Sequence, residues 1–263
     1  NAWTGTEHSC FYFDIEHSQL EQALHRFADM FSAPLFSAEA VDKERHAIEA
    51  EFSMKLKDDG RRIYQAHKES INPAHPFAKF SVGNLQTLDD RPSQSAQQAV
   101  QTFYQQQYSS QRMTLVLVST LSIHEQQALC ERYFSNLPNH LPPKTALQPP
   151  LYLAEHLGIQ LNIQPHKPTQ RFVASFALPD IQPWYRYKLV SFLAHILGDE
   201  GQGSLLSLLK QRGWVNGLSA GGGIDGSNYK DFTLAFELMP EGMFHLDDIL
   251  AESFAYLAML RQQ

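Results

Sequence analysis

The sequence predicts an α+β protein with two domains. Segments with the alternation of strands are mixed with segments of helical periodicity, both before and after residues 138–150. Those residues contain five prolines and predict a linker. The strands come in hairpin-like pairs, so layered α+β domains fit better than a doubly wound parallel sheet. We therefore expect one domain at residues 1–140 and a second at residues 141–263.

The elements of the first part follow from their patterns. Residues 9–15 alternate side chains of two kinds, as a half-buried strand does, and the apolar run at 112–120 predicts a buried strand. Pro34 and the loop containing Pro73, Pro76 and Gly83 separate helical segments. Helices are predicted at 18–31, from 37 or 38 to 56, at 61–71, at 93–108 and at 122–137.

The second part repeats this mixture of strands and helices. Strands are predicted at 158–164, 171–178, 215–222 and 231–239. Helices are predicted at 185–197 and 204–211, and an amphipathic helix at 244–261 closes the chain.

Composition excludes several classes of function. The net charge of −7 and the pI near 5.9 argue against the basic surface that nucleic-acid binding needs. No apolar run approaches the length of a membrane span, so no membrane partner is expected. Two cysteines cannot define a disulfide framework, and the compartment stays open.

Two carboxylates stand out on the helix that begins near residue 38. Glu44 and Glu51 are seven residues apart and share a face with Ala47, Ile48 and Lys55. A carboxylate beside packed surface needs a cation, a proton or hydrogen-bond donors. The simpler interpretation is a surface ion pair between Glu51 and Lys55.

A glycosidase-type carboxylate pair is a poor explanation of the same two residues. Glu44 and Glu51 are two helical turns apart, about 10.5 Å along the helix axis. That separation exceeds the usual distance between the two carboxylates of a glycosidase.

A series of short motifs runs in a fixed order along nearly the whole chain. They are NAWT (1–4), EH (7–8), FYFD (11–14), LHRFA (24–28), FSAPLF (31–36), KER (43–45), AE (50–51), DGRR (59–62), NPAHPF (72–77), GN (83–84), YSS (108–110), GSLL (203–206) and GWVN (213–216). Their order and spacing resemble the pitrilysin/insulinase family of zinc metallopeptidases. The resemblance implies two homologous domains, each a mostly antiparallel sheet covered by helices.

The zinc motif of that family, H-x-x-E-H, is absent. None of the twelve histidines lies in this pattern, which supplies two zinc ligands and the general base. In the family the motif precedes the segment that corresponds to Asn1, so the resemblance implies a piece that begins after the catalytic helix, with both domains truncated. We expect such a piece to be inactive alone and to self-associate through the surfaces left open.

The resemblance gives the two carboxylates distinct roles. Glu51 corresponds to the third zinc ligand, and Glu44 would support the site by orienting ligands through hydrogen bonds. In the complete protein, zinc would activate a water molecule for peptide hydrolysis. His8 and His46 are poor candidates for further ligands, because a strand end and another helix face explain them.

Two further sites follow from the resemblance, and both concern peptide substrates. Asn1 and Ala2 correspond to the strand that lines the cleft and pairs with extended peptide. A plain strand end, or residues left from cloning, is the alternative.

The second peptide site would be an exosite that anchors the substrate N-terminus away from the zinc. Gly198 and Glu200 correspond to one side of it, and Glu200 would accept the peptide ammonium group. Leu218, Ser219 and Ala220 correspond to the strand side. Tight turns would explain the neighbouring glycines but not Glu200.

Together these inferences predict a zinc metalloendopeptidase that degrades peptides in an enclosed chamber. The alternative is a non-catalytic family member that serves as a scaffold or peptide-binding module. The presence of both Glu44 and Glu51 favours the catalytic protein, because a copy without metal has no metal-related reason to keep them.

Overall fold

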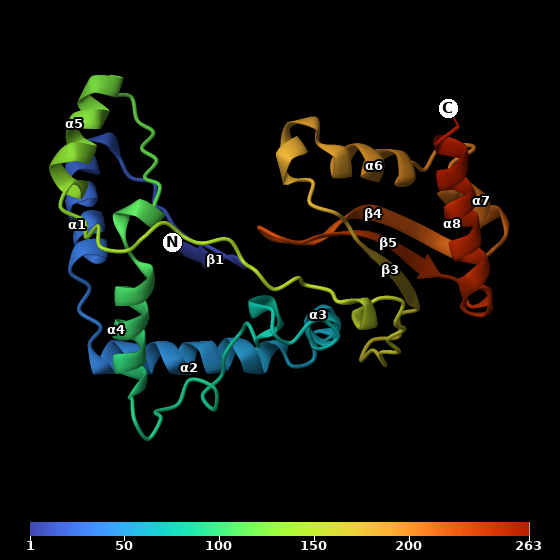
Figure 1. The fold of residues 1–263 in the computed structure, drawn as a ribbon, viewed down its shortest axis with the longest axis horizontal. Helices are drawn as coiled ribbons and strands as arrows, with labels where there is room; N and C mark the ends of the chain where they lie inside the picture. The colour runs from blue at the N-terminus through green and yellow to red at the C-terminus, as the bar shows by residue number, and fades with distance from the viewer. Residues whose placement is uncertain (263) are drawn as a thin grey trace. The chain divides into compact units, whose positions relative to one another are not determined.

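The structure is a computed structural model that describes residues 1–262 (Figure 1). Residue contacts divide it into two units: Asn1–Leu56 with Phe80–Thr145, and Lys57–Lys79 with residues 146–262. The chain passes from the first unit to the second for the last time after Thr145, inside the expected linker. The sequence analysis did not predict that Lys57–Lys79 would belong to the second unit. Helices and antiparallel strands build the chain, which confirms the α+β class. The division into homologous domains at 1–140 and 141–263 stays a prediction.

The first unit consists of helices and one short hairpin. Ser95 and Ser122 each begin a helix with a complete capping box, which satisfies two backbone donors at each helix start. The unit contains β1 (Ala2–Thr4), β2 (Ser9–Phe11), η1 (His17–Gln19), α1 (Leu20–Ser32), α2 (Ala38–Lys55), α4 (Ala96–Gln107), η3 (Ser110–Arg112) and α5 (Ile123–Phe134).

Packing in the first unit follows the apolar stripe of α1. Leu24 and Ala28 of this helix are buried, and Phe27 meets the ring of Phe134 on α5 edge to face. Glu21 adds a polar contact at the rim, because its carboxylate accepts hydrogen bonds of 2.7 Å from Arg132 and Tyr133. The apolar stripe predicted for this helix is therefore a packed face of α1.

The expected buried strand at 112–120 is wrong. Residues after η3 pair with no strand in the part of the chain that the structure describes, and Val116 and Val118 are 76% and 88% exposed. An apolar segment becomes a strand only when a neighbour supplies backbone hydrogen bonds. The predicted strand at 158–164 fails in the same way, and the one at 9–15 shrinks to Ser9–Phe11.

The second unit is built on a three-stranded antiparallel sheet. Its strands are β3 (Arg171–Ala177), β4 (Val215–Asp225) and β5 (Lys230–Leu238), in the order β3-β5-β4. β5 lies in the centre, and the register pairs Phe236 with Phe172 of β3 and with Leu218 of β4. The predicted strands in this part are therefore confirmed, apart from 158–164.

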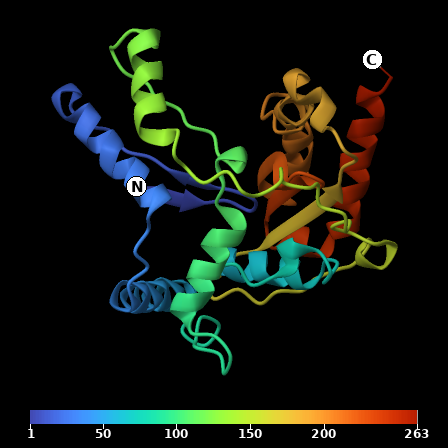
Figure 2. The ribbon, with the colours of Figure 1, turned by 60° about the vertical axis from the view of Figure 1, so that its left-hand side comes forward.

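Helices cover one face of this sheet (Figures 1 and 2). They are α6 (Leu189–Leu197), α7 (Leu205–Gln211) and α8 (Leu246–Leu260), with 3-10 turns η5 (Gln182–Tyr187) and η6 (Glu241–Phe244). Leu209, Phe236 and Ile249 have no exposed surface and form the centre of the core. Burial of such side chains contributes about 1.5–3 kcal/mol each. Among residues 1–262, no helix combines the length and apolarity needed to cross a bilayer.

The excursion of the chain into the second unit consists of α3 (Asp59–Glu69) and η2 (Pro76–Ala78). Ile71, Phe77, Leu151 and Tyr229 form a small buried cluster that joins this segment to the strand-bearing part of its unit. A further 3-10 turn, η4 (Ala154–His156), lies in the adjoining segment. Segment and sheet are therefore packed as one unit, although far apart in sequence.

Candidate functional site

Helix α2 carries the two carboxylates that the sequence singled out. Ser37 caps it, because its hydroxyl accepts a hydrogen bond from the Ala40 amide. One side of the helix packs through Arg45, Glu49 and Phe52, which contact the loop at residues 80–89. Glu49 accepts the Leu85 amide over 2.7 Å, so the one partly buried carboxylate of the helix has a structural partner.

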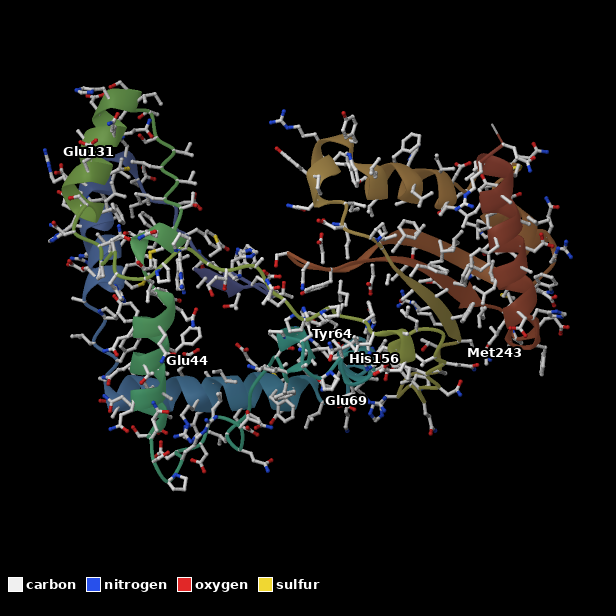
Figure 3. All side chains as sticks on the ribbon, in the orientation of Figure 1. Glu44, Tyr64, Glu69, Glu131, His156 and Met243 are labelled. Carbon is white, nitrogen blue, oxygen red and sulfur yellow. The ribbon has the colours of Figure 1, made fainter. Side chains whose placement is uncertain are left out.

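Glu44 and Glu51 lie away from that packed side. Both are exposed, and neither forms a hydrogen bond or an ion pair with any residue in 1–262 (Figure 3 labels Glu44). The Glu51–Lys55 pair of the simpler interpretation is therefore not formed. Ile48, expected on the same face, is instead partly buried and lies beside Gly83. The helix thus presents two exposed carboxylates that no described side chain neutralises.

The described part of the chain has no ready-made metal centre. Residues 1–262 contain no group of three His, Cys, Asp or Glu side chains that could hold an ion. His8 stacks edge-on against Trp3, and a ring nitrogen of His46 lies 2.9 Å from the Asp42 carbonyl oxygen. Glu51 fits the donor chemistry of zinc as a single carboxylate, but the residues present do not complete a zinc site.

Ala2 begins β1 of the β1–β2 hairpin, and Asn1 immediately precedes it. Ala2 pairs with Phe11, and Asn1 exchanges two backbone hydrogen bonds with Tyr12, of 2.9 and 3.0 Å. The side chains of β1 are exposed. Its other edge has no strand partner within residues 1–262, which leaves that backbone open to an added strand.

The strand half of the predicted exosite is an edge strand. β4 pairs only with β5 in the part of the molecule that the structure describes, so its outer edge has no strand partner. Leu218 is buried and Ala220 partly buried, while Ser219 is exposed. This alternation gives the edge one side turned to the helices and one turned away.

The structure brings the two halves of this site together. A Cβ placed on Gly198, at the end of α6, would lie 4.0 Å from the Ala220 Cβ and 2.8 Å from the Ala194 carbonyl oxygen. Glycine is therefore favoured at this helix end, because the close neighbour is a backbone oxygen of the same helix. Glu200 follows two residues later, exposed and without a hydrogen bond or ion pair to any described residue.

Two other features of the second unit were missed by the sequence analysis. A cavity of about 600 Å³ lies among residues 164–170 and Leu238. Asp59 holds this loop, because its carboxylate accepts hydrogen bonds from the His166 and Lys167 amides. These bonds keep the pKa of Asp59 below its usual value.

The second feature is Asp231, which is buried in β5. The only sign of it in the sequence is an acidic residue at the start of an apolar run.

Two family models match the chain. The model described as "Peptidase M16 inactive domain" matches residues 96–263, and the model described as "Insulinase (Peptidase family M16)" matches residues 1–74. Each match includes residues of both units, and residues 75–95 lie in neither match.

Relatives of known sequence and structure point the same way. The insulin-degrading enzyme of Bos taurus is 35% identical over 266 residues, and protease 3 of Escherichia coli K12 is 31% identical over 264 residues. Both alignments cover 100% of this chain but only 26% and 27% of the relatives. The crystal structure of pitrilysin matches with a TM-score of 0.86 at 31% identity, covering 94% of this chain and 27% of that one. This chain thus spans about a quarter of the length of these relatives.

Proposed function

Since this chain belongs to the peptidase M16, or insulinase, family, we propose that it serves a zinc-dependent endopeptidase as the part that holds the peptide and supplies one metal ligand. The observation that carries the proposal is the open edge of β4, which Gly198 contacts at Ala220, two residues before Glu200 in the sequence. An edge of this kind binds extended backbone of almost any sequence. A peptidase with many substrates needs recognition of that type.

Glu51 is the ligand we assign to the metal. Its carboxylate is exposed and unneutralised within residues 1–262, so it is free to meet a cation brought by other parts of the protein. Glu44 stands two turns away on the same helix and would hydrogen-bond groups around the metal. The remaining ligands and the base do not come from this chain, and we expect the chain alone to be inactive.

Peptide binding would use two strand edges. The edge of β1 at Asn1 and Ala2 would pair with the residues to be cut. The edge of β4 at Leu218, Ser219 and Ala220 would pair with the peptide N-terminal part, whose ammonium group would face Glu200. Both edges lack a strand partner in the described structure, which leaves each of them able to accept an added strand.

Backbone methylation of a peptide tests the proposal directly. A fluorescent peptide should bind the chain, and the same peptide with N-methylated amides should bind more weakly, because each lost backbone hydrogen bond removes about 0.5–1.5 kcal/mol. Fluorescence anisotropy measures both affinities. Equal binding of the two peptides would rule out recognition by strand pairing.

A non-catalytic role is the second candidate, and one observation favours it. The family model that covers residues 96–263 describes an inactive domain. In that case the β4 edge would bind peptides as a scaffold, without a metal at Glu51. Metal analysis of the complete protein distinguishes the two, because only the endopeptidase would hold zinc that is lost on substitution of Glu51.

Self-association is a further part of the proposal. Residues 113–118 form an extended apolar segment in which Val116 and Val118 are largely exposed. Exposed segments of this kind pair with one another. Sedimentation of the chain at rising concentration should then show species larger than a monomer.

A further inference from the structure

Three polar side chains from distant parts of the second unit form a hydrogen-bonded series. The Tyr152 hydroxyl donates to Asp231 Oδ2 over 2.6 Å, and His67 Nε2 lies 2.8 Å from the Tyr152 oxygen. His67 belongs to α3, Tyr152 follows the proline-rich linker, and Asp231 lies in β5. The series therefore ties α3 to the start of the central strand of the sheet.

Asp231 is an unfavourable place for a charge. Its side chain is 1% exposed, and its Oδ1 has no hydrogen-bond partner within residues 1–262. Burial raises the pKa of Asp231, although the bond from Tyr152 and the charge of His67 oppose this. Burial lowers the pKa of His67, and the Asp231 charge opposes that shift. Both shifts favour a neutral Asp231 beside a neutral His67.

The geometry allows His67 and Asp231 to share one proton through Tyr152. With the proton on Asp231, its carboxyl donates to Tyr152, and Tyr152 donates to His67 Nε2. With the proton on His67, every donor is reversed and the same two contacts persist. Without the proton, neutral His67 can still donate from Nε2 to Tyr152, but the Asp231 carboxylate is then buried with no positive charge beside it and with Oδ1 unpaired among the described residues, and that state is unfavourable. His67 is 27% exposed, so solvent can supply or remove the proton.

Neighbouring titratable groups are already engaged. The His75 ring nitrogens contact Asn228 and the Phe77 amide, and Lys230 pairs with Asp225. Lys68 is buried with its ammonium group 4.9 Å from the Phe77 ring centre and 5.6 Å from that of Tyr64, a residue that Figure 3 labels on α3. These groups come from three places: α3 carries Tyr64, His67 and Lys68, and His75 precedes η2. Tyr229 immediately precedes β5, and Lys230 and Asp231 begin it.

We propose that His67, Tyr152 and Asp231 form a proton-operated latch, which holds α3 against β5 when His67 and Asp231 share one proton and loosens when they share none. The latch acts on a segment that is close in sequence to the proposed metal ligand. α3 begins three residues after Leu56, the C-cap of the helix that carries Glu51. Loosening α3 would free this segment from the sheet of its own unit. The inference does not depend on the identity of the metal or the peptide.

The sign of the pH dependence follows from linkage. The folded-state pKa of Asp231 lies above its usual value of 3.8, so the folded state holds an extra proton. Stability from this group declines as pH rises from 3.8 through the raised value. His67 has the opposite effect on stability: its pKa is lowered by burial, so adding a second proton to the pair at acidic pH destabilises the folded state. The latch is therefore tighter below the raised pKa of Asp231 than above it.

Hydrogen exchange of the 263-residue chain tests the latch. After correction for intrinsic rates, amides of α3 should exchange roughly tenfold faster at about pH 8 than at about pH 5, while those of α8 should not change. Asp231→Asn cannot ionise and keeps an oxygen for Tyr152, so its α3 exchange should not depend on pH. Tyr152→Phe should expose α3 at both pH values.

Matched controls separate the latch from general titration. Asp14→Asn removes an exposed carboxylate of the first unit, and it should leave the pH dependence of α3 unchanged. PH-independent α3 exchange in the unmodified chain, or unaltered dependence in Asp231→Asn, would overturn the proposal. If Asp231→Asn does not fold, carboxyl carbon NMR of the unmodified chain decides. A carboxyl that is ionised throughout the range above pH 3.8 contradicts the latch.

Discussion

A Cβ added to Gly198 would lie 2.8 Å from the Ala194 carbonyl oxygen of α6 itself, and it would make an ordinary contact of 4.0 Å with the Ala220 Cβ. The contact joins the end of α6 to the outer strand of the sheet. It also defines the place where a peptide on the β4 edge would meet the residues that follow α6.

Gly198→Ala should therefore destabilise the chain. The added methyl group meets a backbone oxygen that cannot rotate away, and such overpacking removes about 1–3 kcal/mol. Thermal unfolding measures the loss. Gly221→Ala is the matched control, because a Cβ there meets nothing within 4 Å, and it should leave the melting temperature nearly unchanged.

A free amino terminus should strengthen peptide binding at the β4 edge. Glu200 is exposed and has no ionic partner among residues 1–262, so an ammonium group near it gains an attraction of about 0.2–1 kcal/mol. Titration calorimetry should show weaker binding of the N-acetylated peptide, and Glu200→Gln should remove the difference. Identical affinities for free and acetylated peptide in the unmodified chain would contradict the assignment of Glu200.

The two carboxylates of α2 should differ in their effect on catalysis by the complete protein. Glu51→Gln should remove metal and peptide hydrolysis together, because it deletes a ligand. Glu44→Gln should lower activity by about 10–100-fold, as expected for a group that orients ligands. Zinc content and cleavage of a fluorogenic peptide are the measurements.

The isolated chain provides the control for that experiment. With zinc added, it should not cleave the peptide, since base and histidine ligands are missing from its sequence. Chelator-sensitive cleavage by the purified chain would show that the active site is elsewhere than at Glu51.

His245 should stabilise the second unit at low rather than high pH. Its ring stacks on Trp214 with centres 4.6 Å apart, and its Nδ1 lies 2.8 Å from Asp248. The hydrogen bond to Asp248 raises the pKa of His245 above 6.5, despite partial desolvation, with a further contribution from Glu241. The stabilisation is complete below pH 6.5 and is lost as pH rises through the raised value.

His245→Gln should accordingly lower the melting temperature more at about pH 6 than at about pH 9. His124→Gln, an exposed histidine on α5, should have little effect at either pH. A pH-independent loss in His245→Gln would mean that ring stacking, not charge, is the contribution.

Sequence alone determined much of this protein, because some properties depend on local pattern. Periodicity predicted α1, α2, α4 and α5 and the strands β3, β4 and β5, and motif order predicted the family. Serine caps at Ser95 and Ser122 set helix starts by a contact within three residues. The roles of Glu51 and Glu200 stay predictions from the resemblance.

Tertiary structure decided what depends on partners far away in the sequence. An apolar run such as 113–118 has strand propensity, but only a neighbouring edge could make it a strand. The helical pattern of α3 likewise gave no sign that the segment packs with residues 146–262. The meeting of His67, Tyr152 and Asp231 joins residues up to 164 positions apart, and no local pattern encodes such a contact, because it arises only when the packed chain removes Asp231 from water.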